Sequence, residues 1–116
     1  MKYLYLLYAD ESKMPAPDSP QMQQQEAAFG NYYNELSSKG MFKGGDPVKP
    51  SKTSTTVRVR NGSTSTKPGP FAPGGEQVIG FYVIEAKNDD EAIAYAAKVP
   101  SAAVGAVEVR PILSSQ

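Results

Sequence analysis

The chain has 116 residues and a mass of 12.4 kDa, a size that fits one domain, because two separate cores would each bury too little apolar surface. Twelve basic and twelve acidic side chains cancel, so the net charge gives no reason to expect binding to nucleic acid or to an anionic membrane. Histidine and cysteine are both absent, which excludes disulfides, thiolate nucleophiles, imidazole acid–base catalysis and zinc sites built from these residues.

The first forty residues predict a buried strand and a long helix. Residues 2–8 are almost continuously apolar or aromatic, a pattern typical of a central strand covered on both faces. Residues 10–20 contain three prolines and therefore predict a surface loop. Ser19 is a suitable N-cap for a helix over residues 20–39, which presents apolar side chains at helical spacing. Gly40 then ends this helix, because glycine tolerates a positive φ.

The middle of the chain predicts a hairpin between two irregular segments. Residues 41–54 are rich in Gly, Pro, Lys and Ser and predict a short irregular strand followed by a loop. Residues 55–60 alternate in polarity, and Asn61-Gly62 is a turn signal that makes residues 63–66 the return strand of a hairpin. Residues 67–75 contain three prolines and three glycines, so this segment is expected to be a loop.

The last third of the chain predicts a strand, a helix and a strand. Residues 78–84 have the same apolar character as the first strand. Asn88 is a suitable N-cap for a second helix, whose first turn contains three acidic residues that the helix dipole favours. Pro100 stops this helix, and residues 104–110 form the last strand.

This order of elements predicts a single α+β domain over residues 1–116, with a ferredoxin-like split βαβ arrangement and an antiparallel sheet. Two helices cannot cover both faces of such a sheet. The first strand and residues 78–84 carry apolar side chains at both odd and even positions, so both faces of the sheet are apolar. The uncovered face is therefore expected to pack against a second copy in a homodimer.

Several segments along the chain together form a sequence pattern that is typical of one protein family. They are residues 1–8, Thr55-Thr56-Val57-Arg58, Gly69-Pro70-Phe71-Ala72 with Glu76-Gln77, residues 80–86, residues 91–97 and Gly105-Ala106-Val107-Glu108-Val109-Arg110-Pro111. In combination, these segments resemble the YCII-related proteins of the DGPF type, and the resemblance spans most of the chain.

The resemblance implies a dimeric α+β barrel, in which two ferredoxin-like subunits pack sheet to sheet around a cleft. It also implies either an activity on small organic acids or an association with transcription sigma-factor-like proteins. The chain departs from the family pattern at two places: Pro68 stands at the position of the signature aspartate, and Pro73-Gly74-Gly75 replaces a Glu-Thr-Lys run. The histidine–aspartate pair proposed for broader YCII-like proteins has no histidine counterpart in this chain.

Two arginines are candidate anchors for an anionic ligand. Strand alternation places Arg58 opposite its neighbouring valines, and it places Glu108 and Arg110 opposite the valines of the last strand. If these valines pack beneath the helices, the charges face the cleft, where an arginine offers a planar fork to a carboxylate or phosphate. The alternative is that Arg58, Glu76, Glu108 and Arg110 pair with one another or across the dimer.

Asp10 and Glu76 are the candidate proton-transfer residues. Asp10 follows the first strand directly and would serve as a general base if burial in the cleft raised its pKa. The alternative is a solvated acidic residue in a loop.

Four aromatic residues are candidate ligand contacts. Tyr3, Tyr5 and Tyr82 are expected to line the cleft, with apolar rings and hydroxyl tips that suit an aromatic or unsaturated organic acid. Phe71 is expected to cover the cleft from the loop over residues 67–75. The alternatives are tyrosines buried in a homodimer interface and an ordinary rigid connection.

Metal, cofactor, nucleic acid and membrane are not expected to be partners. The paired acids at residues 89–90 are explained by helix capping, and no phosphate-binding glycine motif occurs. Residues 43–67 carry an excess of five positive charges, but no aromatic residue is interleaved for base stacking. No apolar run approaches the roughly 20 residues that cross a bilayer, and a cytoplasmic location is expected.

Two functional hypotheses follow. In the first, a cytoplasmic homodimer binds a small organic anion in the cleft between its sheets, and whether it is an enzyme is left open. In the second, the same dimer is a non-catalytic regulatory or protein-interaction module with transcription-related partners.

Overall fold

The structure is a computed structural model that describes residues 1–113. The strands are β1 (Lys2–Ala9), β2 (Phe42–Pro47), β3 (Thr55–Arg60), β4 (Ser63–Pro68), β5 (Gln77–Glu85) and β6 (Ala106–Pro111). The α-helices are α1 (Pro20–Ser38) and α2 (Asp89–Ala96), and short 3-10 turns cover η1 (Glu11–Lys13), η2 (Ser51–Thr53) and η3 (Pro100–Ala103).

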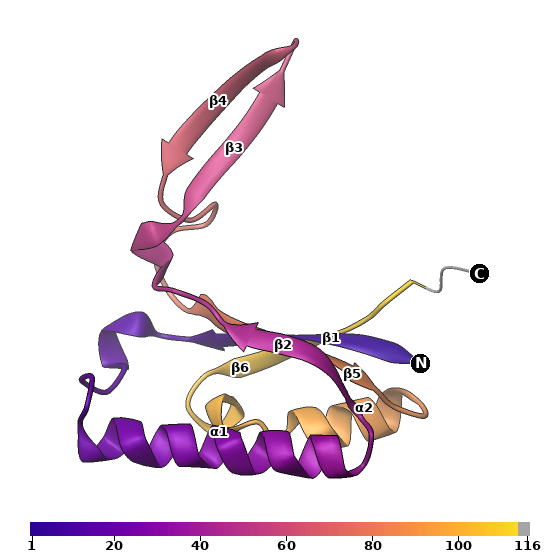
Figure 1. Cartoon of the computed structure of the whole chain (residues 1–116). Coiled ribbons are helices and arrows are strands. Elements are labelled where there is room, and N and C mark those ends of the chain that lie inside the picture. Colours follow the sequence, from indigo (N-terminus) through magenta and orange to yellow (C-terminus); the bar gives the residue numbers. More distant parts are fainter. Residues whose placement is uncertain (114–116) are drawn as a thin grey trace.

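Four strands form the main sheet in the order β2-β5-β1-β6, and every neighbouring pair is antiparallel. Both α-helices lie on the same side of this sheet (Figure 1). The prediction of an α+β domain with an antiparallel sheet and two helices is therefore confirmed, and β1 is a central strand as its apolar sequence indicated.

Three of the predicted helix ends and the hairpin turn are also confirmed, whereas α2 ends at Ala96, several residues before Pro100. The Ser19 hydroxyl accepts a hydrogen bond from the Met22 amide at 3.1 Å, and the Asn88 side chain accepts one from the Glu91 amide at 2.9 Å. Gly40, directly after α1, has a φ of +69°. Asn61 and Gly62 both have positive φ, 51° and 78°, as a type I′ turn requires.

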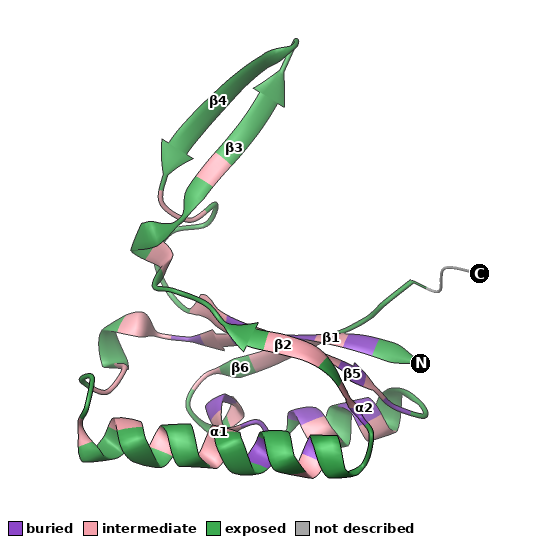
Figure 2. Cartoon of the chain, in the orientation of Figure 1, coloured by how far each residue is buried: buried purple, intermediate pink, exposed green. Residues whose placement is uncertain are grey.

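The core lies between the helices and one face of the sheet. Along β1, Tyr3, Tyr5 and Leu7 are buried while the residues between them are only partly buried (Figure 2). The Tyr5 hydroxyl donates a hydrogen bond to the Ala92 carbonyl of α2 at 2.5 Å, and Leu36 of α1 is fully buried in the same cluster. Burial of each large apolar side chain contributes about 1.5–3 kcal/mol to this packing.

The other face of the sheet has no helix over it (Figure 1). It carries Leu4, Leu6 and Tyr8 of β1, and the antiparallel register places Val83 opposite Leu4 and Phe81 opposite Leu6. All five side chains are partly exposed. These five residues are called the uncovered face below.

The predicted hairpin forms, but it does not join the main sheet. Strands β3 and β4 make a separate two-stranded sheet, called the arm (residues 55–68), which points away from the side of the helices (Figure 1). The expectation that its valines pack beneath the helices is wrong, because Val57 and Val59 are each 57% exposed. The loop expected over residues 67–75 begins only at Gly69, since Lys67 and Pro68 still pair within the arm.

A substitution at Gly45 is expected to destabilise the main sheet. Gly45 has a φ of +150°, and an added Cβ would lie 2.5 Å from the Phe81 carbonyl oxygen. Gly45→Ala should therefore lower the free energy of unfolding by at least about 2 kcal/mol, measured by urea denaturation. Gly44→Ala is the matched control, because nothing lies within 4 Å of its added Cβ. Equal stability of the two variants would contradict this geometry.

Candidate functional site

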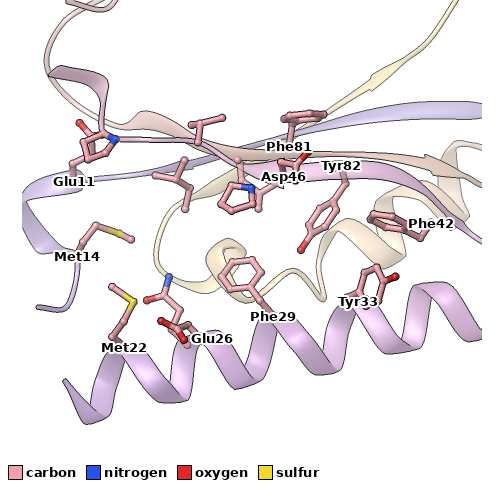
Figure 3. A pocket seen from close by; sticks show the side chains of 18 residues that line it. Glu11, Met14, Met22, Glu26, Phe29, Tyr33, Phe42, Asp46, Phe81 and Tyr82 are labelled. Atoms are coloured by element: carbon pink, nitrogen blue, oxygen red, sulfur yellow. The ribbon is translucent and has the colours of Figure 1, made fainter. Parts of the chain in front are cut away.

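A cavity of about 520 Å³ lies between α1 and the sheet, and is called the α1 pocket (Figure 3). Met22, Phe29 and Tyr33 reach it from α1, while Phe42 and Tyr82 reach it from β2 and β5. Figure 3 shows Phe29 and Tyr33 on the helix facing Phe42 and Tyr82 on the sheet. The volume is within the range of small-molecule sites in proteins.

Part of the floor of the pocket is strand backbone without side chains. Gly45 of β2 and Gly80 of β5 form part of its floor. An added Cβ at Gly80 would lie 3.2 Å from the Asp46 carbonyl oxygen. The buried residues of α1 are Tyr32 and Leu36 in its second half, and the first half of the helix, which lines the pocket, is only partly buried.

Aromatic rings form one end of the pocket. The Phe42 ring lies 4.8 Å from the Tyr33 ring and 6.2 Å from the Tyr82 ring, centroid to centroid, and both pairs are edge-to-face. The Tyr82 hydroxyl points into the pocket toward α1 (Figure 3). Burial raises the pKa of Tyr82, so its phenol stays protonated and keeps a hydrogen bond to donate.

The charged residues that line the pocket are all acidic, namely Glu11, Glu26 and Asp46, and the register Asp46↔Phe81 places the Asp46 side chain on the uncovered face. No lysine or arginine is among the described residues that line it. Glu11 accepts hydrogen bonds from the Ser51 amide at 2.7 Å and from the Ser51 hydroxyl at 2.5 Å, and these bonds lower the pKa of its carboxyl group. The electrostatics of the pocket therefore disfavour an anionic ligand.

A second hollow, of about 710 Å³, lies where the arm leaves the sheet and is called the arm-base hollow. Tyr8 and Val78 of the main sheet line it together with Lys49, Phe71 and Glu76. Its remaining lining is rich in hydroxyl groups, from Ser51, Thr53, Ser54, Thr55 and Thr56. Two of the residues predicted for the site, Phe71 and Glu76, thus come together here.

Arg58 and Arg110 come from different parts of the molecule. Arg58 belongs to the arm, and its guanidinium lies 5.0 Å from the centre of the Phe71 ring. Arg110 belongs to β6 and forms an ion pair with Glu108 on the same strand. The predicted alternative of charge pairing is thus observed for Glu108 and Arg110. The Tyr8 hydroxyl also donates a hydrogen bond to Glu108 at 3.4 Å. Phe71 is 73% exposed in the single chain.

Asp10 does not have the environment of a general base with a raised pKa. It caps η1, where its carboxylate accepts hydrogen bonds from the Ser12 amide at 3.0 Å and the Ser12 hydroxyl at 2.7 Å. These bonds lower the pKa of Asp10, which is the opposite of the expected direction. Glu76 lies in an exposed loop at the arm-base hollow.

Tyr3 and Tyr5 lie on the opposite side of the sheet from the expected cleft. Both are fully buried in the core, where Tyr5 bonds to α2 and the Tyr3 hydroxyl donates to the Asp89 carboxylate at 2.7 Å. That bond and burial raise the pKa of Tyr3 to about 12. Tyr82 is on this same face, as the register Tyr5↔Tyr82 shows, and it is the one predicted tyrosine that lines the α1 pocket.

The α1 pocket itself was missed by sequence reasoning. Met22, Phe29 and Tyr33 belong to the apolar side chains at helical spacing in residues 20–39, and this spacing also fits a stripe that packs in the core. The signal that distinguishes the two interpretations is the pair of glycine positions at 45 and 80 on the strands opposite this stripe. The strand pairing that brings them together is not visible in the sequence.

Residues 1–113 contain no group of three His, Cys, Asp or Glu side chains arranged to hold a metal ion. Neither of the helices in this part of the chain has the length and apolarity needed to cross a membrane.

Comparison with known proteins gives three findings. The family model of the YCII-related domain matches residues 1–115. An uncharacterised protein of Rhizobium meliloti (strain 1021) is 32% identical over 117 residues, with 97% of this chain and 92% of that protein covered. Among solved structures, the chain is similar to the 5-chloro-2-hydroxyhydroquinone dehydrochlorinase of Burkholderia phenoliruptrix AC1100 in complex with 2,5-dihydroxybenzoquinone, with a TM-score of 0.53, 19% identity, and 99% of this chain and 96% of that chain covered.

Replacement of Glu11 with Gln is expected to destabilise the protein at neutral pH and to have less effect in acid. The folded-state pKa of Glu11 lies below its ordinary value of 4.5. Its carboxylate therefore contributes stability that is fully present above that value and is lost as the pH falls through the folded-state pKa. Urea midpoints of wild type and Glu11→Gln should differ at about pH 7 and converge at about pH 3.

Ser51→Ala serves as the control for this pH dependence. In that background Glu11→Gln should change the urea midpoint less, because the hydroxyl bond is already gone. A wild-type-to-variant difference that is the same at both pH values would show that the carboxylate is not stabilised by Ser51.

Proposed function

The chain belongs to the YCII-related family, and from that premise we propose that it binds a small, unsaturated organic molecule in the α1 pocket. The observation that carries the proposal is the pocket itself: about 520 Å³, walled by aromatic and apolar side chains, with a few polar groups at defined places. The structural neighbour from Burkholderia phenoliruptrix binds a small quinone, which supports a ring-shaped ligand for this fold.

The lining favours an uncharged ligand with hydrogen-bond donors. The carboxylate of Glu26 is an acceptor, and the protonated Tyr82 phenol is both a donor and an acceptor. Phe29 and Phe42 both line the pocket (Figure 3) and offer aromatic contacts to a ring-shaped ligand. A phenol or hydroquinone combines these features, whereas a carboxylic acid would bring its negative charge close to the carboxylates of Glu11 and Glu26.

For the α1 pocket we propose binding alone. Without histidine or cysteine, any proton transfer there would fall to carboxyl groups and tyrosine phenols, and of the carboxylates Glu11 is held by Ser51 and Glu26 is exposed. Glu76 lines the arm-base hollow and stays the candidate for proton transfer there, whereas Asp10 lines neither hollow.

The arm-base hollow supports a second candidate function, the binding of a small organic anion. Lys49 lines this hollow, and Arg58 stands over the Phe71 ring beside it. The hydroxyl-rich lining offers further hydrogen bonds to a carboxylate. The hollow includes Tyr8 and Val78 on the face of the sheet that carries no helix, where a second copy would close it.

The proposal includes the finer architecture implied by the family resemblance. The strand order β2-β5-β1-β6 supports a ferredoxin-like subunit with the arm as an insertion. The apolar uncovered face supports a sheet-to-sheet homodimer, the dimeric α+β barrel. Membership of the DGPF type, a cytoplasmic location and the alternative of a regulatory module with transcription-related partners remain predictions.

Titration of isotope-labelled protein with two ring compounds tests the ligand proposal. Resorcinol, an uncharged ring with two hydroxyl groups, should shift the backbone resonances of Gly45 and Gly80 in the α1 pocket. Tyr82→Phe should weaken this binding about fivefold, since one hydrogen bond is lost. Tyr8→Phe removes a hydroxyl from the other face of the sheet and should leave the affinity unchanged.

Benzoate, an anionic ring of similar size, is the second compound. It should not shift Gly45 or Gly80. If resorcinol leaves these resonances unchanged while benzoate shifts those of Lys49 and Phe71, the α1 pocket proposal fails and the arm-base hollow takes its place.

A further inference from the structure

The arm has two chemically different faces. In its antiparallel register Val57 pairs with Thr66 and Val59 with Thr64, so two valines and two threonine side chains share one face. The other face carries Arg58, Arg60 and Lys67 with small hydroxyl residues. This pattern is typical of a β-hairpin whose apolar face packs against another protein surface.

Nothing in the described chain covers the apolar side of the arm. Val57 and Val59 are each 57% exposed, and every residue of β4 is exposed (Figure 2). An isolated two-stranded hairpin is only marginally stable in water. The radius of gyration of 16.1 Å also exceeds the value of about 13 Å typical of a compact domain of this length. The arm is therefore shaped for contact outside its own subunit.

The arm and the uncovered face lie on the same side of the molecule. Figure 1 shows the arm rising from the sheet on the side opposite the helices. The uncovered face, with Leu6 and Phe81 near its middle, points to that side. A molecule that binds to the uncovered face therefore lies next to the arm.

We propose that the arm is a clasp that packs its valine face against a second copy of this chain seated on the uncovered face. This inference rests on the sheet-to-sheet homodimer of the proposed function. Packed sheets lie about 10 Å apart. A six-residue strand such as β3 extends about 20 Å. The arm therefore reaches past the sheet of the second copy to the level of its helix layer.

Two features favour a second copy over an unrelated partner. A two-fold pair is self-complementary, so one arrangement covers both uncovered faces and both valine faces at once. The arm carries three basic and no acidic residues, which leaves the rest of this neutral chain with a net charge of −3. The body of a second copy therefore attracts the arm at long range, while the contact itself is made by the valine face, opposite the basic side chains.

The clasp also completes the arm-base hollow. Tyr8 and Val78 line this hollow and belong to the face that the second copy covers. Phe71 and Lys49 line it beside the arm. A second copy on the uncovered face therefore roofs this hollow, and the site is incomplete in a single subunit.

Sedimentation analysis of matched variants tests the clasp. Val57→Asn with Val59→Asn places two polar amides on the valine face and should weaken dimerisation at least about tenfold. Ser63→Asn with Ser65→Asn places the same amides on the opposite face of the arm, leaves its charge unchanged, and should change the dimer dissociation constant less than about threefold. Far-UV circular dichroism checks that each variant keeps the wild-type fold.

Substitutions in the uncovered face separate failure of the clasp from failure of the dimer. Leu6→Asp, with Val83→Lys as a second variant, should give a folded monomer. If these variants are monomeric while the valine variant dimerises like wild type, the dimer stands and the clasp is wrong. If wild type is monomeric at all concentrations, or if it dimerises and the uncovered-face variants leave the dimer intact, the sheet-to-sheet dimer is wrong and the clasp is overturned with it.

Discussion

Two helices can cover only one face of a four-stranded sheet, and the alternation of side chains along β1 and β5 divides the molecule accordingly. One parity, with Tyr3 and Tyr5, is buried beneath α2 and α1. The other parity, with Leu4 and Leu6, is mostly apolar on β1 and β5, lies beside Glu108 and Arg110 of β6, and carries no helix. Apolar side chains on a surface this wide favour association, so the same constraint that builds the core also leaves a surface for a second copy. The α1 pocket lies on the first side and the arm on the second.

The two candidate sites share a wall. Residues 48–54 run between β2 and the arm, and Val48 lines both the α1 pocket and the arm-base hollow. This segment is held at three points: the Val48 amide bonds to the Ile79 carbonyl at 3.0 Å, Ser51 bonds to Glu11, and the Ser54 carbonyl accepts from the Gly69 amide at 2.8 Å. The two hollows are therefore connected by a short stretch of backbone whose position is fixed by these hydrogen bonds. The charge of the two linings differs, since Lys49 faces only the arm-base hollow.

Local features of the sequence predicted local structure well, and they failed where pairing between distant segments decided the outcome. Caps at Ser19 and Asn88 and the turn at Asn61-Gly62 act within a few residues, so their signals were sufficient. Arg58 does alternate with the valines of β3. This alternation does not reveal that β2 forms the edge strand of the main sheet, which leaves the hairpin outside that sheet. For the same reason, the parity of Tyr5 did not show which face the helices cover. The α1 pocket depends on glycines of two strands that meet only in the folded sheet.

The central claim is that the two faces have separate roles, one for the core and a ligand, the other for a second copy. Because the chain has no cysteine, a single Leu6→Cys variant reports directly on the uncovered face. Its rate of reaction with a maleimide, measured over a range of protein concentrations, tests the claim. The account predicts slow labelling in concentrated protein and a rise toward the rate of an exposed thiol on dilution. Fast labelling at every concentration would show that this face stays open to solvent and would contradict the account.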